Sequence, residues 1–137
     1  MNIIIDTNIL VRFLLASEKG TEQHKIAAHF IDEADEIIIP THVFCELVWV
    51  LINGYKINPA VVHAALSDFL RRDKLVIRDD EVEAGMLFLE KGGDFADGVI
   101  AHTGRNMTRS RAVFVSFDKK AIRLLTESGI TAMLPQI

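Results

Sequence analysis

NIIIDTNILVRFL, residues 2–14, is the stretch that decides the fold class. Its first part is a β-branched run that ends at Asp6, and Leu10, Phe13 and Leu14 then recur at the spacing of one helix face. The stretch therefore predicts a strand, a turn and a helix.

The same alternation of strand and helix continues along the chain. Apolar runs predict strands at residues 36–39, 74–77, 112–117 and 129–133. Helices are predicted at residues 21–34, 41–52, 58–70, 80–91, 94–106 and after the fourth strand. Nearly continuous apolar strands separated by helices predict a parallel sheet covered on both faces. The expected fold class is α/β, a three-layer α/β/α sandwich with a central four- to five-stranded parallel sheet.

Length and composition bound the class of protein. The chain has 137 residues, 50% of them hydrophobic and 25% charged, which predicts one compact domain over residues 1–137. A lone cysteine, Cys45, excludes an internal disulfide framework and a cysteine-rich zinc site. The longest apolar run, residues 42–52, is interrupted by Glu46 and is shorter than the roughly 20 residues of a membrane-spanning helix. Since no secretory signal pattern opens the chain, we expect a cytoplasmic protein with no membrane contact.

Charge is distributed unevenly along the chain. Fifteen Lys and Arg against 19 Asp and Glu give a net charge of -4, which argues against a general nucleic-acid coat. Residues 102–126 nevertheless hold six basic residues and one acid. This stretch is therefore the expected place for contact with an anion.

Four acids stand where acids are not expected. Asp6 terminates the first strand and Asp118 terminates the strand AVFVSF, so both are expected at the carboxyl edge of the sheet, where such sheets bind ligands. Glu46 is the only ionisable residue in VFCELVWVLI, a helix that we expect to be buried on most sides, with Trp49 in the core. Asp97, in DFADGVIAH, lies one turn into a helix.

Each of these acids also has an ordinary structural interpretation. Asp6 and Asp118 are equally well explained as N-caps of the helices that follow them. Asp94 with Asp97 resembles a capping box with Asp in the place of Glu. Glu46 is harder to explain, because a buried carboxylate with no Lys or Arg within one turn must be paired, protonated or bound to a metal.

Taken together, the four acids predict a divalent cation. Like charges at close range repel strongly in a low-dielectric site, and a cation removes that conflict. Oxygen ligands without a Cys or His cluster select Mg²⁺ or Mn²⁺ over zinc. Such ions serve phosphoryl chemistry, because they lower the pKa of a bound water, place it in line with a phosphodiester and stabilise the leaving oxygen.

Four motifs stand in the order and spacing of a known family. DTNIL at 6–10, CELVWVL at 45–51, DFADGVIAH at 94–102 and SFDKKA at 116–121 resemble the motifs of PIN domains and, within them, of VapC-type toxin ribonucleases of type II toxin-antitoxin systems. The resemblance covers nearly the whole chain. It implies a PIN-like fold and a Mg²⁺-dependent endoribonuclease in which Mn²⁺ can substitute.

The resemblance also implies the roles of individual residues. The four acids, Asp6, Glu46, Asp97 and Asp118, would be catalytic, and all but Glu46 would bind the metal. Asp94 would be a supporting acid, and Thr7, Asn8 and Ser116 would orient carboxylates and waters.

By family analogy, metal-activated water attacks the phosphodiester and no covalent protein intermediate forms. The substrate would be structured RNA, tRNA or ribosomal RNA, and a cognate antitoxin protein would hold the toxin inactive. A homodimer is expected. RNA binding would depend on the local basic stretch, in which Arg105, Arg109 and Arg111 are the candidates for backbone contacts, although a solvated helix end and loop explains them equally well.

Other functions compete with the toxin. A PIN nuclease for RNA processing or structured DNA would use the same acids, because they recognise phosphate and metal without specifying the sugar. A metal-dependent signalling receiver is a non-enzymatic alternative. The position of the paired acids counts against it, because Asp79 and Asp80 follow the third strand instead of the first. A haloacid-dehalogenase-type phosphatase would need a second Asp where Asn8 stands.

Overall fold

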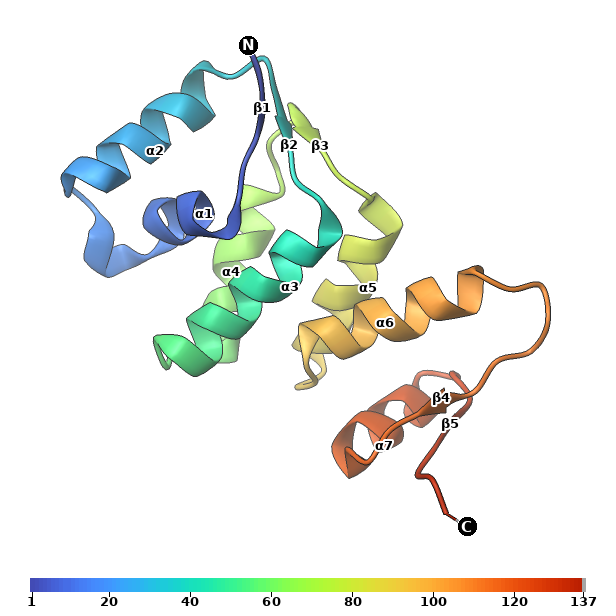
Figure 1. Cartoon of the computed structure of the whole chain (residues 1–137). Coiled ribbons are helices and arrows are strands. Elements are labelled where there is room, and N and C mark those ends of the chain that lie inside the picture. Colours follow the sequence, from blue (N-terminus) through green and yellow to red (C-terminus); the bar gives the residue numbers. More distant parts are fainter. Residues whose placement is uncertain (137) are drawn as a thin grey trace. The chain divides into compact units, whose positions relative to one another are not determined.

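The computed structural model describes residues 1–136, and Ile137 lies outside the described residues. The described chain is a mixed α/β structure with seven α-helices and short parallel strands (Figure 1). It divides into two compact units, Met1–Arg78 and the part that begins at Asp79. Each unit is described by itself below.

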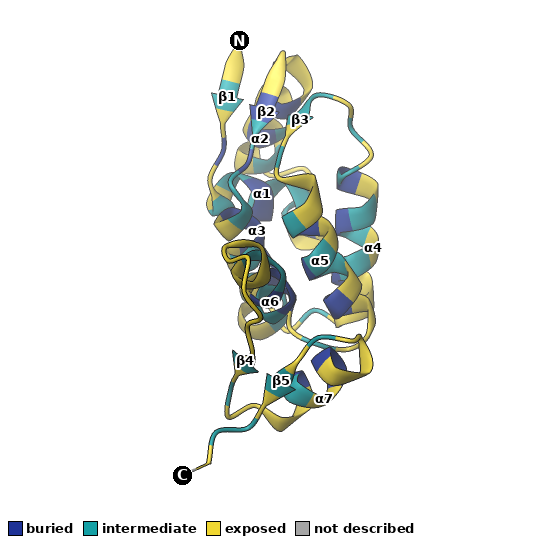
Figure 2. Ribbon diagram, turned by 90° about the vertical axis from the view of Figure 1, so that its right-hand side faces the viewer, coloured by how far each residue is buried: buried dark blue, intermediate teal, exposed yellow. Residues whose placement is uncertain are grey.

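The first unit holds a three-stranded parallel sheet in the order β1-β2-β3. Helices α1 and α2 lie on one face of this sheet (Figures 1 and 2). The elements of the unit are β1 (Asn2–Ile4), α1 (Thr7–Leu14), the 3₁₀ turn η1 (Ala16–Glu18), α2 (Glu22–Glu33), β2 (Glu36–Ile38), α3 (Thr41–Trp49), the π-helical segment η2 (Val50–Gly54), α4 (Pro59–Phe69) and β3 (Leu75–Val76).

Burial of one face of each element gives the first unit its own core. The fully buried side chains come from α1, α2, β2, α3 and α4, so each of these helices turns an apolar stripe toward the interior of the unit. They include Leu10, Ile31, Ile37, Phe44, Leu47, Leu66 and Phe69. In the register of the three strands, the buried Ile37 of β2 lies opposite Ile3 of β1 and Leu75 of β3.

The second unit has a separate, smaller sheet. Its elements are α5 (Asp79–Glu90), α6 (Phe95–Asn106), β4 (Phe114–Val115), α7 (Lys119–Glu127) and β5 (Ala132–Met133). Strands β4 and β5 pair in parallel. Phe88, Ala101, Leu124 and Leu125 form the buried cluster that joins α5, α6 and α7.

A glycine lets α5 and α6 approach closely. A Cβ at Gly98 would lie 2.7 Å from the carbonyl oxygen of Ala84 and 2.6 Å from the Cβ of Phe88, so no larger residue fits at this crossing. The chain reverses between the two helices at Gly92, whose φ of +90° favours glycine. Gly98 thereby sets how deeply the first turn of α6 sits against α5.

The predicted order of elements is confirmed, and the strands are parallel. They are joined as three plus two strands, and one sheet of four or five strands is not seen within residues 1–136. No helix among the described residues is long and apolar enough to cross a membrane.

The prediction that α3 is buried on most sides is wrong. Only one face of the helix is buried, and it carries Phe44 and Leu47, whereas Glu46 is exposed and Trp49 keeps 60% of its surface exposed. Apolar side chains make up much of any protein surface, so an apolar sequence alone does not require burial on every side.

Candidate active site

Asp6 stands at the carboxyl end of β1 and caps α1. Its Oδ1 accepts a hydrogen bond from the backbone N–H of Ile9 at 3.2 Å, and the side chain is exposed. The interpretation as an N-cap is therefore confirmed. Only one carboxylate oxygen is used for the cap, so the position also suits the binding of a ligand at the strand end.

Thr7 connects the start of α1 to Glu46 on α3. Its hydroxyl Oγ1 donates a hydrogen bond to Glu46 Oε2 at 2.9 Å. This contact joins residues 39 positions apart in the sequence, and it holds the Glu46 carboxylate beside the helix that Asp6 caps. Asn8 is exposed in the same first turn of α1.

Asp97 is the acid whose surroundings differ most from water. It is half-buried in the first turn of α6, and its pKa is raised from 3.8 to about 6. Burial of the carboxylate is the largest cause, followed by the negative charges of Asp94 and Asp118. Three carboxylates of the second unit therefore act on one another electrostatically.

The expected capping box at the start of α6 is wrong. Asp94 occupies the N-cap position with extended backbone, but its side chain makes no capping hydrogen bond. The carboxylate is exposed and close enough to Asp97 to raise its pKa. Asp94 therefore contributes negative charge to this group and leaves the end of the helix uncapped by a side chain.

Asp118 repeats the arrangement of Asp6 at the end of β4. Its Oδ1 accepts from the backbone N–H of Ala121 at 3.1 Å and caps α7. The hydroxyl oxygen of Ser116 accepts from the backbone N–H of Asp118 at 3.0 Å, which fixes the turn between strand and helix. The expected role of Ser116 in orienting carboxylates and waters stays a prediction, because this contact is made to the backbone of Asp118.

The structure thus places the predicted acids in two groups. One contains Asp6 and the hydrogen-bonded pair of Thr7 and Glu46, and the other contains Asp94, Asp97 and Asp118. Within residues 1–136, no Lys or Arg forms an ion pair with any of these carboxylates. Charge and ligand type fit a hard divalent cation. In the same range, however, no three His, Cys, Asp or Glu side chains gather closely enough to hold a metal.

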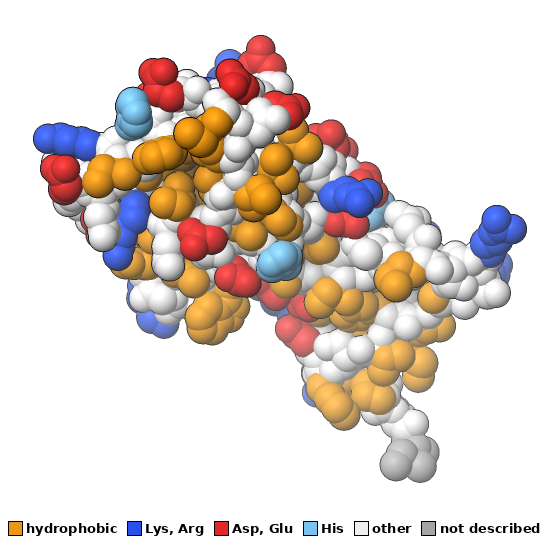
Figure 3. Space-filling view, turned by 45° about the horizontal axis from the view of Figure 1, so that its top comes forward, with side chains coloured by type: hydrophobic (Ala, Val, Ile, Leu, Met, Phe, Trp, Pro, Cys, Tyr) orange, Lys and Arg blue, Asp and Glu red, His pale blue; other side chains and the backbone are white. Residues whose placement is uncertain are grey.

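The candidate arginines are exposed. Arg105 lies in the last turn of α6, and Arg109 and Arg111 lie in the segment that follows. On the face shown in Figure 3, the Lys and Arg side chains are scattered among acidic and apolar ones instead of forming one large basic patch. His102 of α6 contacts Asp80 at 2.9 Å, and this contact lowers the pKa of Asp80.

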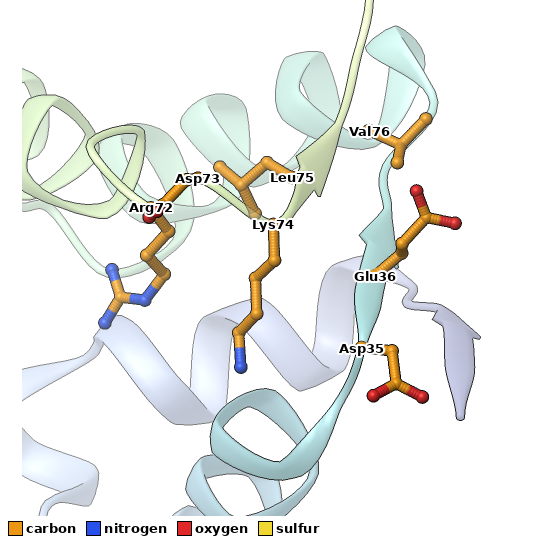
Figure 4. A pocket seen from close by; sticks show the side chains of 7 residues that line it. All are labelled: Asp35, Glu36, Arg72, Asp73, Lys74, Leu75 and Val76. Carbon is orange, nitrogen blue, oxygen red and sulfur yellow. The ribbon is translucent and has the colours of Figure 1, made fainter.

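A hollow also lies at the opposite edge of the three-stranded sheet, where β2 and β3 begin. In the close view of Figure 4, Asp35 and Glu36 at the start of β2 lie on one side of the hollow, and Arg72 and Lys74, which precede β3, lie on the other. Lys74 is already engaged, since its Nζ donates to the carbonyl oxygens of Asp32 and Ala34 at 2.8 and 3.2 Å. The hollow is lined by both acidic and basic side chains, and Lys74 already donates to backbone carbonyl oxygens. It is therefore a weaker candidate for the active site than the carboxyl ends of the strands.

Comparison with known proteins agrees with the motifs. A family model described as PIN domain matches residues 3–125, a range that contains every candidate acid. No curated protein matches the chain.

Proposed function

The chain belongs to the PIN domain family, and on that premise we propose that it is a Mg²⁺-dependent endoribonuclease that acts as the toxin of a toxin-antitoxin pair. PIN domains have a nuclease fold, so hydrolysis of a phosphodiester is the reaction class. The proposed substrate is structured RNA, either tRNA or ribosomal RNA. Mn²⁺ is expected to replace Mg²⁺.

The observation that carries the proposal is the crowding around Asp97. Burial and two neighbouring acids raise its pKa to about 6, so its ionised form is disfavoured while no cation is bound. A divalent cation would relieve both the desolvation and the repulsion. Ligands that are all carboxylates favour Mg²⁺ or Mn²⁺ over zinc.

We propose that Asp6, Asp97 and Asp118 are the ligands of the ion. Asp6 and Asp118 each use Oδ1 to cap a helix, which leaves the other oxygen for the ion. When bound, the ion would lower the pKa of a water and offset the negative charge of the phosphate.

The chain's own residues would orient the reacting groups. Thr7 would hold the Glu46 carboxylate in one orientation through its hydroxyl, and Ser116 would fix the turn that carries Asp118. Asp94 would add negative charge, and Asn8 would position water. Arg105, Arg109 and Arg111 would contact the RNA backbone.

The proposed fold is one domain over residues 1–137, a three-layer α/β/α sandwich with a central parallel sheet of four to five strands. In a parallel sheet of this kind, acids that follow strands stand at the carboxyl edge, where such sheets bind ligands.

Cleavage of total cellular RNA by the purified protein tests the nuclease. The expected result is discrete products with Mg²⁺ or Mn²⁺, none with EDTA, and none from Glu46→Gln. A folded, antitoxin-free protein that cleaves no RNA with either metal would contradict the proposal. A parallel reaction with structured DNA separates the toxin from a nuclease of broader substrate range.

The toxin role needs its own test. The proposed cytoplasmic homodimer would be inhibited by an antitoxin encoded in a small neighbouring reading frame with a DNA-binding domain and a charged, amphipathic tail. Expression of the chain should arrest growth, and co-expression of that neighbour should restore it. A chain without such a neighbour, whose expression leaves growth unchanged, would instead act in RNA processing.

A further inference from the structure

Helix α3 carries a stripe of exposed side chains on the same face as Glu46. His42, Glu46 and Trp49 stand at positions i, i+4 and i+7, and all three are exposed. With 3.6 residues per turn, the three lie within an arc of about 60° on the helix surface. Side chains at such spacings are direct neighbours.

The orientation of this stripe is fixed from both sides of the helix. On the opposite side, Phe44, Leu47 and Val48 are buried in the core of the first unit. On the stripe itself, the hydroxyl of Thr7 donates to Glu46 Oε2 at 2.9 Å. His42 and Trp49 therefore flank the carboxylate that stands beside the Asp6 cap, one helical turn to either side of it.

Trp49 is the one aromatic residue of the stripe, whose other exposed positions are polar. It keeps 60% of its surface exposed, and the next position along the same stripe, Asn53, is exposed and polar. An interface with another protein would call for a contiguous apolar patch, which this stripe does not supply. A single aromatic ring among polar side chains is suited to stacking against one base of a single-stranded nucleic acid.

Because the chain is acidic, RNA binding needs contacts that do not depend on its net charge. A net charge of -4 offers little general attraction for a phosphate backbone, and on the face shown in Figure 3 the basic side chains are scattered. Stacking does not depend on net charge, and an imidazole N–H can donate to a phosphate oxygen. His42 and Trp49, beside Glu46, can therefore bind RNA without a contribution from the net charge of the chain.

We propose that His42 and Trp49 are RNA-contacting residues, with the Trp49 ring stacked on a base and His42 donating to a phosphate oxygen on the other side of Glu46. The inference rests on the proposed nuclease function, because it takes Glu46 as the mark of the cleavage site. It adds a substrate-binding surface on α3 to the acids and arginines considered above.

Trp49 is the only tryptophan of the chain, so its fluorescence reports this contact directly. The experiment adds a single-stranded RNA oligonucleotide of mixed sequence to the full-length Asp97→Asn protein with Mg²⁺, a background expected to bind without cleaving. We expect the Trp49 emission to be quenched as the RNA binds. Binding measured by anisotropy of a labelled oligonucleotide should weaken roughly tenfold in Trp49→Ala and less in Trp49→Phe, which keeps a stacking ring. His42→Ala should weaken binding severalfold.

The matched control is Phe30→Ala, which removes an aromatic ring of 46% exposure from α2. This variant should bind RNA as the parent does. Equal RNA affinity in Trp49→Ala and Phe30→Ala would overturn the inference. So would a Trp49→Ala protein that binds RNA normally but has a different oligomeric mass in sedimentation, because Trp49 would then serve self-association.

Cleavage distinguishes this inference from the function on which it rests. In the otherwise wild-type chain, Trp49→Ala should raise KM about tenfold and leave kcat nearly unchanged. Normal RNA cleavage by a Trp49→Ala protein with unchanged KM would overturn the stacking contact and leave the nuclease standing. Quenching by RNA in a wild-type protein that cleaves nothing would support the contact and contradict the nuclease.

Discussion

The acids of the first unit and Asp97 of the second unit are held in opposite ways. In the first, Asp6 and Glu46 are exposed, and each accepts a hydrogen bond, from a backbone N–H and from the Thr7 hydroxyl. In the second, Asp97 is half-buried, accepts no hydrogen bond from the described residues and is crowded by two other carboxylates. Hydrogen-bond donors orient Asp6 and Glu46, whereas burial and repulsion raise the pKa of Asp97.

This difference predicts different roles for the acids, positioning for Asp6 and Glu46 and metal affinity for Asp97. Carboxylates that are already hydrogen-bonded are positioned before any ligand arrives. Carboxylates that repel one another gain most from a cation, because it removes a cost that the metal-free protein bears. The second unit should therefore dominate metal affinity, and the first should dominate geometry.

The most severe test removes the charge of Asp97. Asp97→Asn should reduce RNA cleavage on the order of a thousandfold, because it deletes a proposed ligand of the ion. Cleavage rates of the variant and the parent with Mg²⁺ measure the effect, with circular dichroism as the check on folding. A variant that cleaves at the parental rate would show that the site has been assigned wrongly.

Loss of the Thr7 hydroxyl tests the hydrogen-bonded group. Thr7→Val keeps the shape of the side chain and removes the donor to Glu46, so cleavage should fall about 10- to 100-fold. Thr7→Ser restores the donor and should recover most of the rate. If the two substitutions have equal effects on cleavage, the hydrogen bond is not what orients Glu46.

Packing beneath Asp97 is tested at Gly98. Gly98→Ala would force a Cβ against the Ala84 carbonyl oxygen and should lower the free energy of unfolding by about 1–3 kcal/mol. Gly104→Ala is the control on the same helix, where a Cβ meets nothing within 4 Å, and it should be neutral or stabilising. Urea unfolding of both variants gives the comparison, and similar midpoints would contradict the close approach of α5 and α6.

The smallest expected effect is the pH dependence of stability. Asp97 has a pKa of about 6 in the folded protein and 3.8 as its ordinary value, so between these values the folded state binds more protons than the unfolded state. Stability without metal should therefore fall as the pH rises from about 4 to above 6, by about 1 kcal/mol, since partial exposure screens the repulsion. In EDTA, the stability of Asp97→Asn should not fall by this amount over the same pH range. In the parent, added Mg²⁺ should restore the stability that is lost above pH 6. Identical pH profiles for the two proteins would contradict the crowding of Asp97.

Much of the local structure was predictable. Asp6 and Asp118 were predicted as strand-end acids and as caps, and both descriptions hold because a residue two or three positions after a strand can serve as the N-cap of the next helix. Predictions of burial on α3 failed. Hydrophobicity along a helix does not reveal how many of its faces meet a neighbour, so Glu46 and Trp49 were expected inside and lie outside.

The sequence by itself determined the alternation of strands and helices, the acids at the strand ends and the family to which these motifs belong. These features depend on residue type and on spacing within a few positions of the chain. Only the tertiary structure decided that Thr7 holds Glu46, that Asp94 and Asp118 crowd Asp97, and that Gly98 brings α6 against α5. Most of these contacts join residues that are distant in sequence, and they form only after packing has determined which face of each helix is turned inward.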